Sequence, residues 1–229
     1  MLNLRLLSLI LMLGLAGSVS YSQKVTVTAT TNPKEIDRVL KEQRDESSTN
    51  RAFFSEIDRC RVVLKAGDWL LAEKTCRLAL SLSDKLPKTQ LLERSEARTC
   101  VGLSLLGQKR AGEAITMFNT AIAERQSYSS EPDADTADIY SLIAHANVIE
   151  LNVETALTNY EIAERMYRAA FTNIGDDGDE IRFSYPRRLR NALGSHYELL
   201  KETGRSDQAE TLHARIVEVD KEFAKYLVN

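Results

Sequence analysis

The sequence is short of several features that define whole classes of protein. Its 229 residues include only three cysteines, four prolines and one tryptophan. Three cysteines are too few for a scaffold built from disulfides, and no His-x-x-x-His pair or glycine-rich phosphate loop marks a metal or nucleotide site. Lysine and arginine total 30 against 33 acidic residues, with no basic block, so nucleic acid is not an expected partner. We therefore expect no catalytic residues, no metal and no cofactor.

Only the N-terminus carries a long apolar run. Arg5 is followed by a mostly apolar run from Leu6 to Leu15 and then by small residues, which is the pattern of a secretory signal peptide. The run is shorter than the ~20 residues of a spanning helix, and no cysteine follows it to accept a lipid. We predict a signal peptide over residues 1–22 and a secreted or periplasmic mature chain without stable membrane insertion.

A spacing of small and bulky residues recurs along the rest of the chain. Three copies have leading alanines 42 residues apart, and a fourth, weaker copy follows 53 residues after the third. An internal repeat of this length predicts a stack of similar supersecondary units. The copies are Ala72, Cys76 and Ala79; Ala114, Phe118 and Ala121; Ala156, Tyr160 and Ala163; and Ala209, His213 and Ile216.

A second set of positions supports helical hairpins. Twelve residues before the leading alanines stand Cys60, Gly102, Ala144 and Tyr197, of which three are small. A small residue facing a small residue lets two antiparallel helices approach closely, while an aromatic one turn later fills the space beyond them. Apolar residues recur at helical spacing, and no comparable strand pattern exists after the N-terminal region. The sequence therefore predicts an all-α fold.

This alternation resembles the tetratricopeptide repeat. The small residue of SEARTCVGLSLLG, the alanine, aromatic and alanine of GEAITMFNTAIAE, and the turns GDW and TGRSDQA match it over residues 53–227. The 42-residue period is similar to the kinesin light chain type. The resemblance implies a right-handed α-solenoid of about four hairpins over residues 51–229, with a divergent fourth hairpin.

The resemblance also implies where a partner binds. In such repeats the first helix of each hairpin lines a concave surface that holds peptides or partner helices. We expect a non-catalytic exported scaffold or adaptor for a protein or peptide partner, although each polar candidate also fits ordinary solvated surface. The candidates carried over by position are Arg61, Lys65, Thr99, Leu103, Ser141 and His145, with Asn191 and Glu198 in the fourth hairpin.

The two ends of the repeat region have their own patterns. Residues 23–50 are interpreted as a linker and a short leading helix, with Asn32 as N-cap and Pro33 at the first helical position. From Ala209 to Tyr226 a 3,4,3,4,3 spacing of apolar residues predicts a long helix with one apolar seam. That seam fits a cap on the stack or, alternatively, a structural envelope protein that forms a homodimer through this helix.

Three alternatives stay open at this point. Cys60 and Cys76 fall on facing helices at similar distances from the GDW turn, so they form either a disulfide or two buried thiols. The acidic stretch 176–180 lacks the ligand spacing of a calcium loop and is interpreted as a solvated turn. An enzyme of unknown class is the remotest functional alternative, because repeat scaffolds mainly bind.

Overall fold

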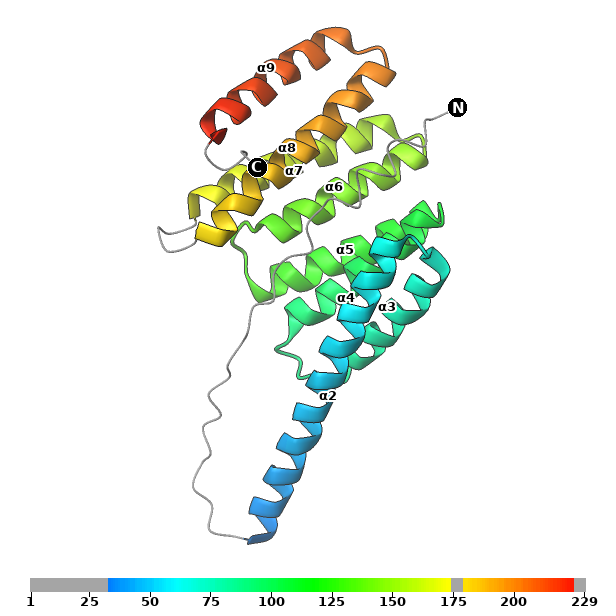
Figure 1. Ribbon diagram of the computed structural model, residues 1–229, viewed down its shortest axis with the longest axis vertical. Helices are drawn as coiled ribbons and strands as arrows, with labels where there is room; N and C mark the ends of the chain where they lie inside the picture. Colours follow the sequence, from blue (N-terminus) through cyan, green and yellow to red (C-terminus); the bar gives the residue numbers. More distant parts are fainter. Residues whose placement is uncertain (1–32, 174–178, 225–229) are drawn as a thin grey trace.

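The computed structural model describes residues 33–173 and 179–224 and is all-helical over them (Figure 1). The signal peptide expected over residues 1–22 and the linker after it lie outside the described residues. Eight helices and no strand are present in these two ranges. In chain order they are α2 (Pro33–Ala66), α3 (Trp69–Ser83), α4 (Leu91–Gly107), α5 (Ala111–Tyr128), α6 (Ala134–Ile149), α7 (Val153–Asn173), α8 (Asp179–Glu202) and α9 (Ser206–Glu222).

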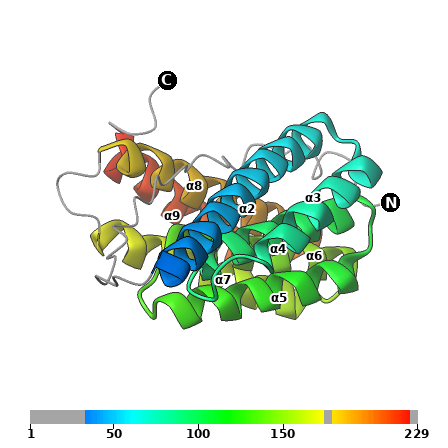
Figure 2. The same cartoon turned by 90° about the horizontal axis from the view of Figure 1, so that it is seen from below.

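The helices pack in chain order as four hairpins. Each helix contacts the next one along the chain, both within a hairpin and between hairpins. The first helices of successive hairpins also contact one another, α2 with α4, α4 with α6 and α6 with α8. Figures 1 and 2 show the resulting stack, in which α2 lies beside α3 and α4 at one end and α9 lies at the other. The predicted all-α solenoid of helical hairpins is confirmed.

The repeated small and aromatic residues form the core of this stack. The alanines of the first three copies and Phe118 have no exposed surface, and Tyr160 and Ala209 are each 3% exposed. The buried residues fall into two clusters, one in the first two hairpins and extending into α6, the other in the last two. The alanines at positions 72, 79, 114, 121, 144, 156 and 163 therefore point into the core, as the repeat spacing predicts.

Gly102 lies directly against the ring of Phe118. A small residue is expected at this position, and a Cβ added to Gly102 would lie 2.4 Å from Cε1 of the Phe118 ring. Both residues are buried. Because a buried aromatic ring in a close-packed core has little room to move, the absence of a side chain at Gly102 is what lets α4 and α5 approach around Phe118.

Replacing Gly102 with Ala tests this packing. We expect the free energy of unfolding in urea to fall by about 1–3 kcal/mol, the usual cost of overpacking a core. Helix propensity alone would favour alanine by about 1 kcal/mol, so the sign of the change separates the two effects. Gly194→Ala in α8 is the matched control, since a Cβ there meets no atom within 4 Å. A Gly102→Ala protein as stable as the wild type would contradict the close contact.

The first helix is longer than the sequence pattern predicts. Residues 33–66 form one continuous helix, so within the described residues the predicted leading helix is the N-terminal part of α2 and not a separate element. The hydroxyls of Ser48 and Thr49 donate to the Asp45 carbonyl at 2.8 and 3.0 Å, so both are satisfied within the helix. The N-terminal half of α2 projects beyond the packed hairpins (Figure 1).

The connection before the fourth hairpin is shorter than predicted. The Gly, Asp, Ser and Pro content of NIGDDGDEIRFSYP, residues 173–186, predicts a connection between hairpins, but α8 begins at Asp179 and contains Pro186. A proline inside a helix removes one backbone hydrogen bond. The burial of Pro186 among neighbours such as Leu189 offsets part of that loss, since both side chains are buried.

The apolar seam near the C-terminus packs on the stack itself. Ala209, Leu212, Val219 and Phe223 are buried within the cluster of the last two hairpins, and the Phe223 ring lies edge-on to Phe171 of α7 at a centroid distance of 4.6 Å. Helix α9 ends at Glu222, and Tyr226 lies outside the described residues. The seam is therefore used inside this chain, as a capping helix requires.

Candidate functional site

The first helices of the first two hairpins present two parallel rows of side chains. On α2, Phe54, Asp58, Arg61 and Lys65 are spaced 4,3,4 and so lie along one side of the helix. On α4, the same spacing relates Leu92, Glu96, Thr99 and Leu103. Arg61 donates to Glu96, which joins the two rows. We call these eight residues the first-helix surface.

The first-helix surface contains four of the predicted binding residues. Lys65 is exposed, and Arg61, Thr99 and Leu103 are partly exposed, so the structure brings these four together on an accessible face. Two apolar members, Phe54 at 46% exposure and the partly exposed Leu92, were not predicted. Their signal in the sequence is their position two helical turns before Arg61 and Thr99.

Ser141 and His145 correct the prediction for the third hairpin. They are only 7% and 8% exposed, so they offer no binding surface. Helix α6 packs against α4, α5, α7 and α8 at once, which covers it on all sides. His145 Nδ1 lies 3.3 Å from the Tyr160 hydroxyl, and Ser141 donates to the Ala137 carbonyl at 3.2 Å. Both polar groups are thus satisfied in the core.

The fourth-hairpin candidates stand apart from the other four. Asn191 is partly exposed and Glu198 is exposed, both on α8. Because α6 lies between α4 and α8 in the order of contacts, its buried third-hairpin positions separate these two residues from the first-helix surface.

Ion pairs at the first-helix surface fix the charge state of Arg61. Its Nη1 lies 2.7 Å from Asp58 of the same helix, in addition to its bond to Glu96. Burial acts to lower the pKa of the guanidinium, but Glu96 and Asp58 raise it and the net direction is upward. Burial raises the pKa of Glu96, and Arg61 opposes that shift. Arg61 therefore mainly holds α2 and α4 together, and Lys65 is the more accessible cation.

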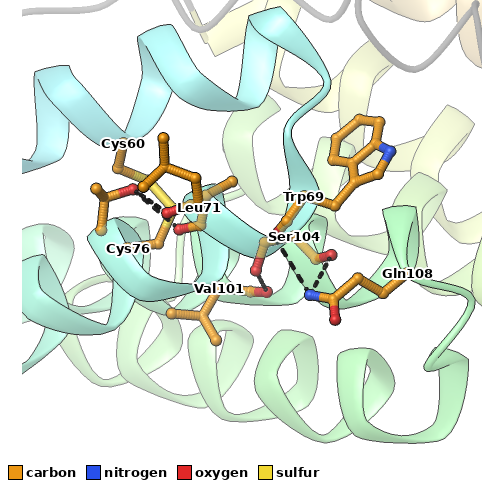
Figure 3. Close-up of a disulfide and its surroundings, with 9 residues drawn as sticks. Cys60, Trp69, Leu71, Cys76, Val101, Ser104 and Gln108 are labelled. Atoms are coloured by element: carbon orange, nitrogen blue, oxygen red, sulfur yellow. Dashed lines mark hydrogen bonds between the residues drawn. A yellow bond between two sulfur atoms is a disulfide. The ribbon is translucent and has the colours of Figure 1, made fainter.

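Covalent and polar links brace the first two hairpins (Figure 3). A disulfide joins Cys60 of α2 to Cys76 of α3, with their Cα atoms 5.0 Å apart. This is the bridged state of the two alternatives left open by the sequence. The remaining cysteine, Cys100, is a buried free thiol whose pKa is raised by burial.

The turn of the first hairpin is bonded to the turn of the second. The Gln108 amide donates to the Trp69 carbonyl at 3.3 Å and to Glu73 at 2.8 Å, and Arg110 donates to Glu73 at 2.7 Å. The Trp69 ring covers Gly107 so closely that a Cβ there would lie 2.2 Å from Cδ2 of the indole. This contact was not predicted. Together with the disulfide it holds α2, α3 and α4 as one support beneath the first-helix surface.

A charge cluster around the buried Arg188 joins the remaining hairpins. Arg188 of α8 has Nη2 2.7 Å from Asp135 and also bonds Asp138, which accepts a further hydrogen bond from the Tyr167 hydroxyl. Arg125 of α5 lies 2.9 Å from Asp135. Four consecutive helices, α5 to α8, therefore share one network.

A metal site and a membrane span are both missing from the residues that the structure describes. Within them, no group of three or more His, Cys, Asp or Glu side chains is arranged to hold a metal ion. The same ranges contain no helix long and apolar enough to cross a membrane. Most of the acidic turn 176–180 lies outside the described residues.

Comparisons with protein-family models, with curated proteins and with solved structures find no match.

Proposed function

We propose that this protein is a non-catalytic, exported scaffold of the tetratricopeptide repeat type that binds a protein or peptide partner on its first-helix surface. The observation that carries the proposal is the joining of two first-helix rows by the Arg61–Glu96 pair, above a disulfide-braced support. A preorganised surface loses little conformational entropy on binding, which favours affinity.

The chemistry of the surface indicates an amphipathic partner. Phe54, Leu92 and Leu103 supply accessible apolar area, and an aromatic side chain is a frequent anchor of binding energy. Lys65 offers a cation beside them, whereas Arg61 is already neutralised by two carboxylates. A peptide with an apolar side chain next to an acidic one fits this arrangement.

Self-association through α9 is the second candidate, and the structure favours it less. The apolar seam that would form the dimer contact is buried against this chain's own helices. Light scattering tests self-association. A mass that rises with protein concentration, and that returns to the monomer mass when exposed α9 residues are substituted, would support self-association.

The test uses peptides selected from a random library displayed on phage. We expect selected peptides to bind the double variant Phe54→Ala, Lys65→Glu at least about tenfold more weakly than the wild type, the effect of losing about 1.4 kcal/mol. Leu78→Ala, Lys74→Glu is the matched control: Leu78 is 46% exposed like Phe54, Lys74 is exposed, and both lie on α3 outside the surface. Arg61 is left intact because its loss would also disturb the α2–α4 contact.

Peptides that bind both double variants as well as the wild type would place recognition elsewhere on the molecule. Failure to select any peptide on the folded, disulfide-bonded protein would count against the proposal as a whole.

A further inference from the structure

A small cavity lies between the last three helices, away from the first-helix surface. Its volume is about 140 Å³, and α7, α8 and α9 all contribute to its wall. Aromatic rings make up much of that wall, with Leu189 beside them; the rings are those of Tyr167, Phe171, Tyr185 and Phe223.

The volume matches a single six-membered ring. An engineered apolar cavity of about 150 Å³ in another protein stays dry and binds benzene. Aromatic rings pack well edge-to-face against other rings, and Phe171 and Phe223 already meet in that way at an interplanar angle of 75°. A further ring entering the cavity would find the same kind of contact.

Two of the rings are held in place by the charge cluster around Arg188. The Tyr167 hydroxyl donates to Asp138, and the Arg188 guanidinium lies 5.4 Å from the centre of the Tyr185 ring. Both contacts restrain these rings without a ligand. The cavity wall is therefore preorganised, which reduces the entropy lost on binding.

The charges at the cavity select for a neutral ligand. Arg168 and Glu222 both line it, with Arg168 Nη1 3.8 Å from the Glu222 carboxylate. Arg168 also donates to Glu164 at 3.1 Å. A cationic ligand would meet Arg168 and an anionic ligand would meet Glu222, so neither gains a net attraction.

We propose that this cavity is a binding site for one uncharged aromatic ring, presented as the Phe or Tyr side chain of a partner polypeptide. A ring buried in such a pocket is the usual form of an interface anchor. The site is independent of the first-helix surface, so its failure would leave the proposed function standing, and the converse also holds.

The experiment measures binding of p-cresol, the side-chain analogue of tyrosine, by saturation-transfer NMR on the folded protein. We expect a Kd of about 1 mM or tighter, the range open to a small ligand with few non-hydrogen atoms. Benzylammonium and benzoate carry the same ring with a charge, and each is expected to bind at least about tenfold more weakly, because its charge is desolvated without a net attraction from the Arg168–Glu222 pair.

Filling the cavity should abolish binding. Thr172 lines the cavity from an exposed position near the end of α7. The indole of Thr172→Trp can therefore fill the cavity from its solvent side without displacing core side chains. Thr158→Trp, at an exposed position on the same helix, is the matched control and should bind p-cresol normally. Leu189→Trp, checked for folding by circular dichroism, fills the cavity from its buried side.

No detectable p-cresol binding to the wild type would overturn the proposal. So would binding that survives both filled variants, or charged rings that bind as tightly as p-cresol. Binding of p-cresol that appears only after removal of residues 225–229 would mean that the chain's own C-terminal residues occupy the cavity. That result would also overturn the proposal that a partner binds there.

Discussion

Replacing Arg188 with Met is expected to lower the free energy of unfolding by about 3–5 kcal/mol, the usual cost of breaking a buried ion pair by removing one partner. The side chain of Arg188 is only 8% exposed, and of its two carboxylate partners on α6 Asp138 is 18% exposed and Asp135 is 61% exposed, so Asp138 forms the buried pair. Burial raises the pKa of Asp138 even though Arg188 opposes that shift. Without Arg188, Asp138 would lose its charged partner and keep only the hydrogen bond from the Tyr167 hydroxyl. Urea denaturation followed by circular dichroism at neutral pH measures the loss.

Arg190 supplies the matched control for this prediction. It lies two residues further along α8 and pairs with Asp220 at 2.7 Å, but its side chain is 50% exposed. Arg190→Met should therefore cost less than about 1 kcal/mol. Adding Asp138→Asn to Arg188→Met should recover part of the stability, because the unpaired carboxylate is then removed. Equal losses for Arg188→Met and Arg190→Met would mean that the charge cluster around Arg188 does not hold the third and fourth hairpins together.

The core of the hairpins was predictable because it depends on local spacing. Ala114, Phe118 and Ala121 recur at intervals that any helix places on one side, and all three have no exposed surface. The exact contact partners were less predictable. The spacing does not say that the atoms nearest to Gly102 belong to the Phe118 ring, because the position of a ring across two helices depends on their relative rotation.

The repeat pattern does not predict which residues of different hairpins contact one another. The Trp69 ring rests on Gly107. No spacing rule relates these two residues, because they lie in separate hairpins and neither type recurs at the corresponding positions of the other copies. Arg188 reaches Asp135 and Asp138 across the connection before α8, where the repeat period itself is interrupted. Such pairs become visible only when the hairpins have been placed in three dimensions.

The error at Ser141 and His145 does have a sequence signal. Positional transfer places them on an open surface, but α6 lacks a polar side over most of its length, as ADTADIYSLIAHANVI shows. A helix without a polar face is buried on all sides. Recognising this would have restricted the predicted surface to the first two hairpins, where α2 and α4 carry accessible polar side chains.

The burial of two histidines, His145 and His196, is expected to make the fold sensitive to acid. His145 of α6 faces the hydroxyl of Tyr160. The ring of His196 of α8 stacks on the Tyr160 ring, with the two ring centroids 5.5 Å apart. Burial lowers the pKa of His145 to about 4. Burial also lowers the pKa of His196 to about 4, with Glu164 acting to raise it and Arg215 to lower it.

Stability should fall as the pH is lowered from about 6.5 to about 4. In the unfolded chain both histidines take up a proton near pH 6.5, whereas the folded state resists protonation until about pH 4, so the unfolded state binds more protons between these values. The two histidines together should cost several kcal/mol, about 3 kcal/mol each at most. Asp138 acts in the opposite direction because its pKa is raised, so the comparison must be made between variants that all retain it.

The test measures the free energy of unfolding in urea across this pH range for the single variants His145→Gln, His196→Gln and His213→Gln. The comparison separates the contribution of the two buried histidines from that of the other titrating groups. His213→Gln, at an exposed position on α9, is the matched control. Each of the other two substitutions should remove about half of the loss on acidification, because each removes one buried base from the linkage. If the unfolding free energy of all three variants depends on pH as that of the wild type does, His145 and His196 are not the source of the acid sensitivity. The sensitivity must then come from the carboxylates.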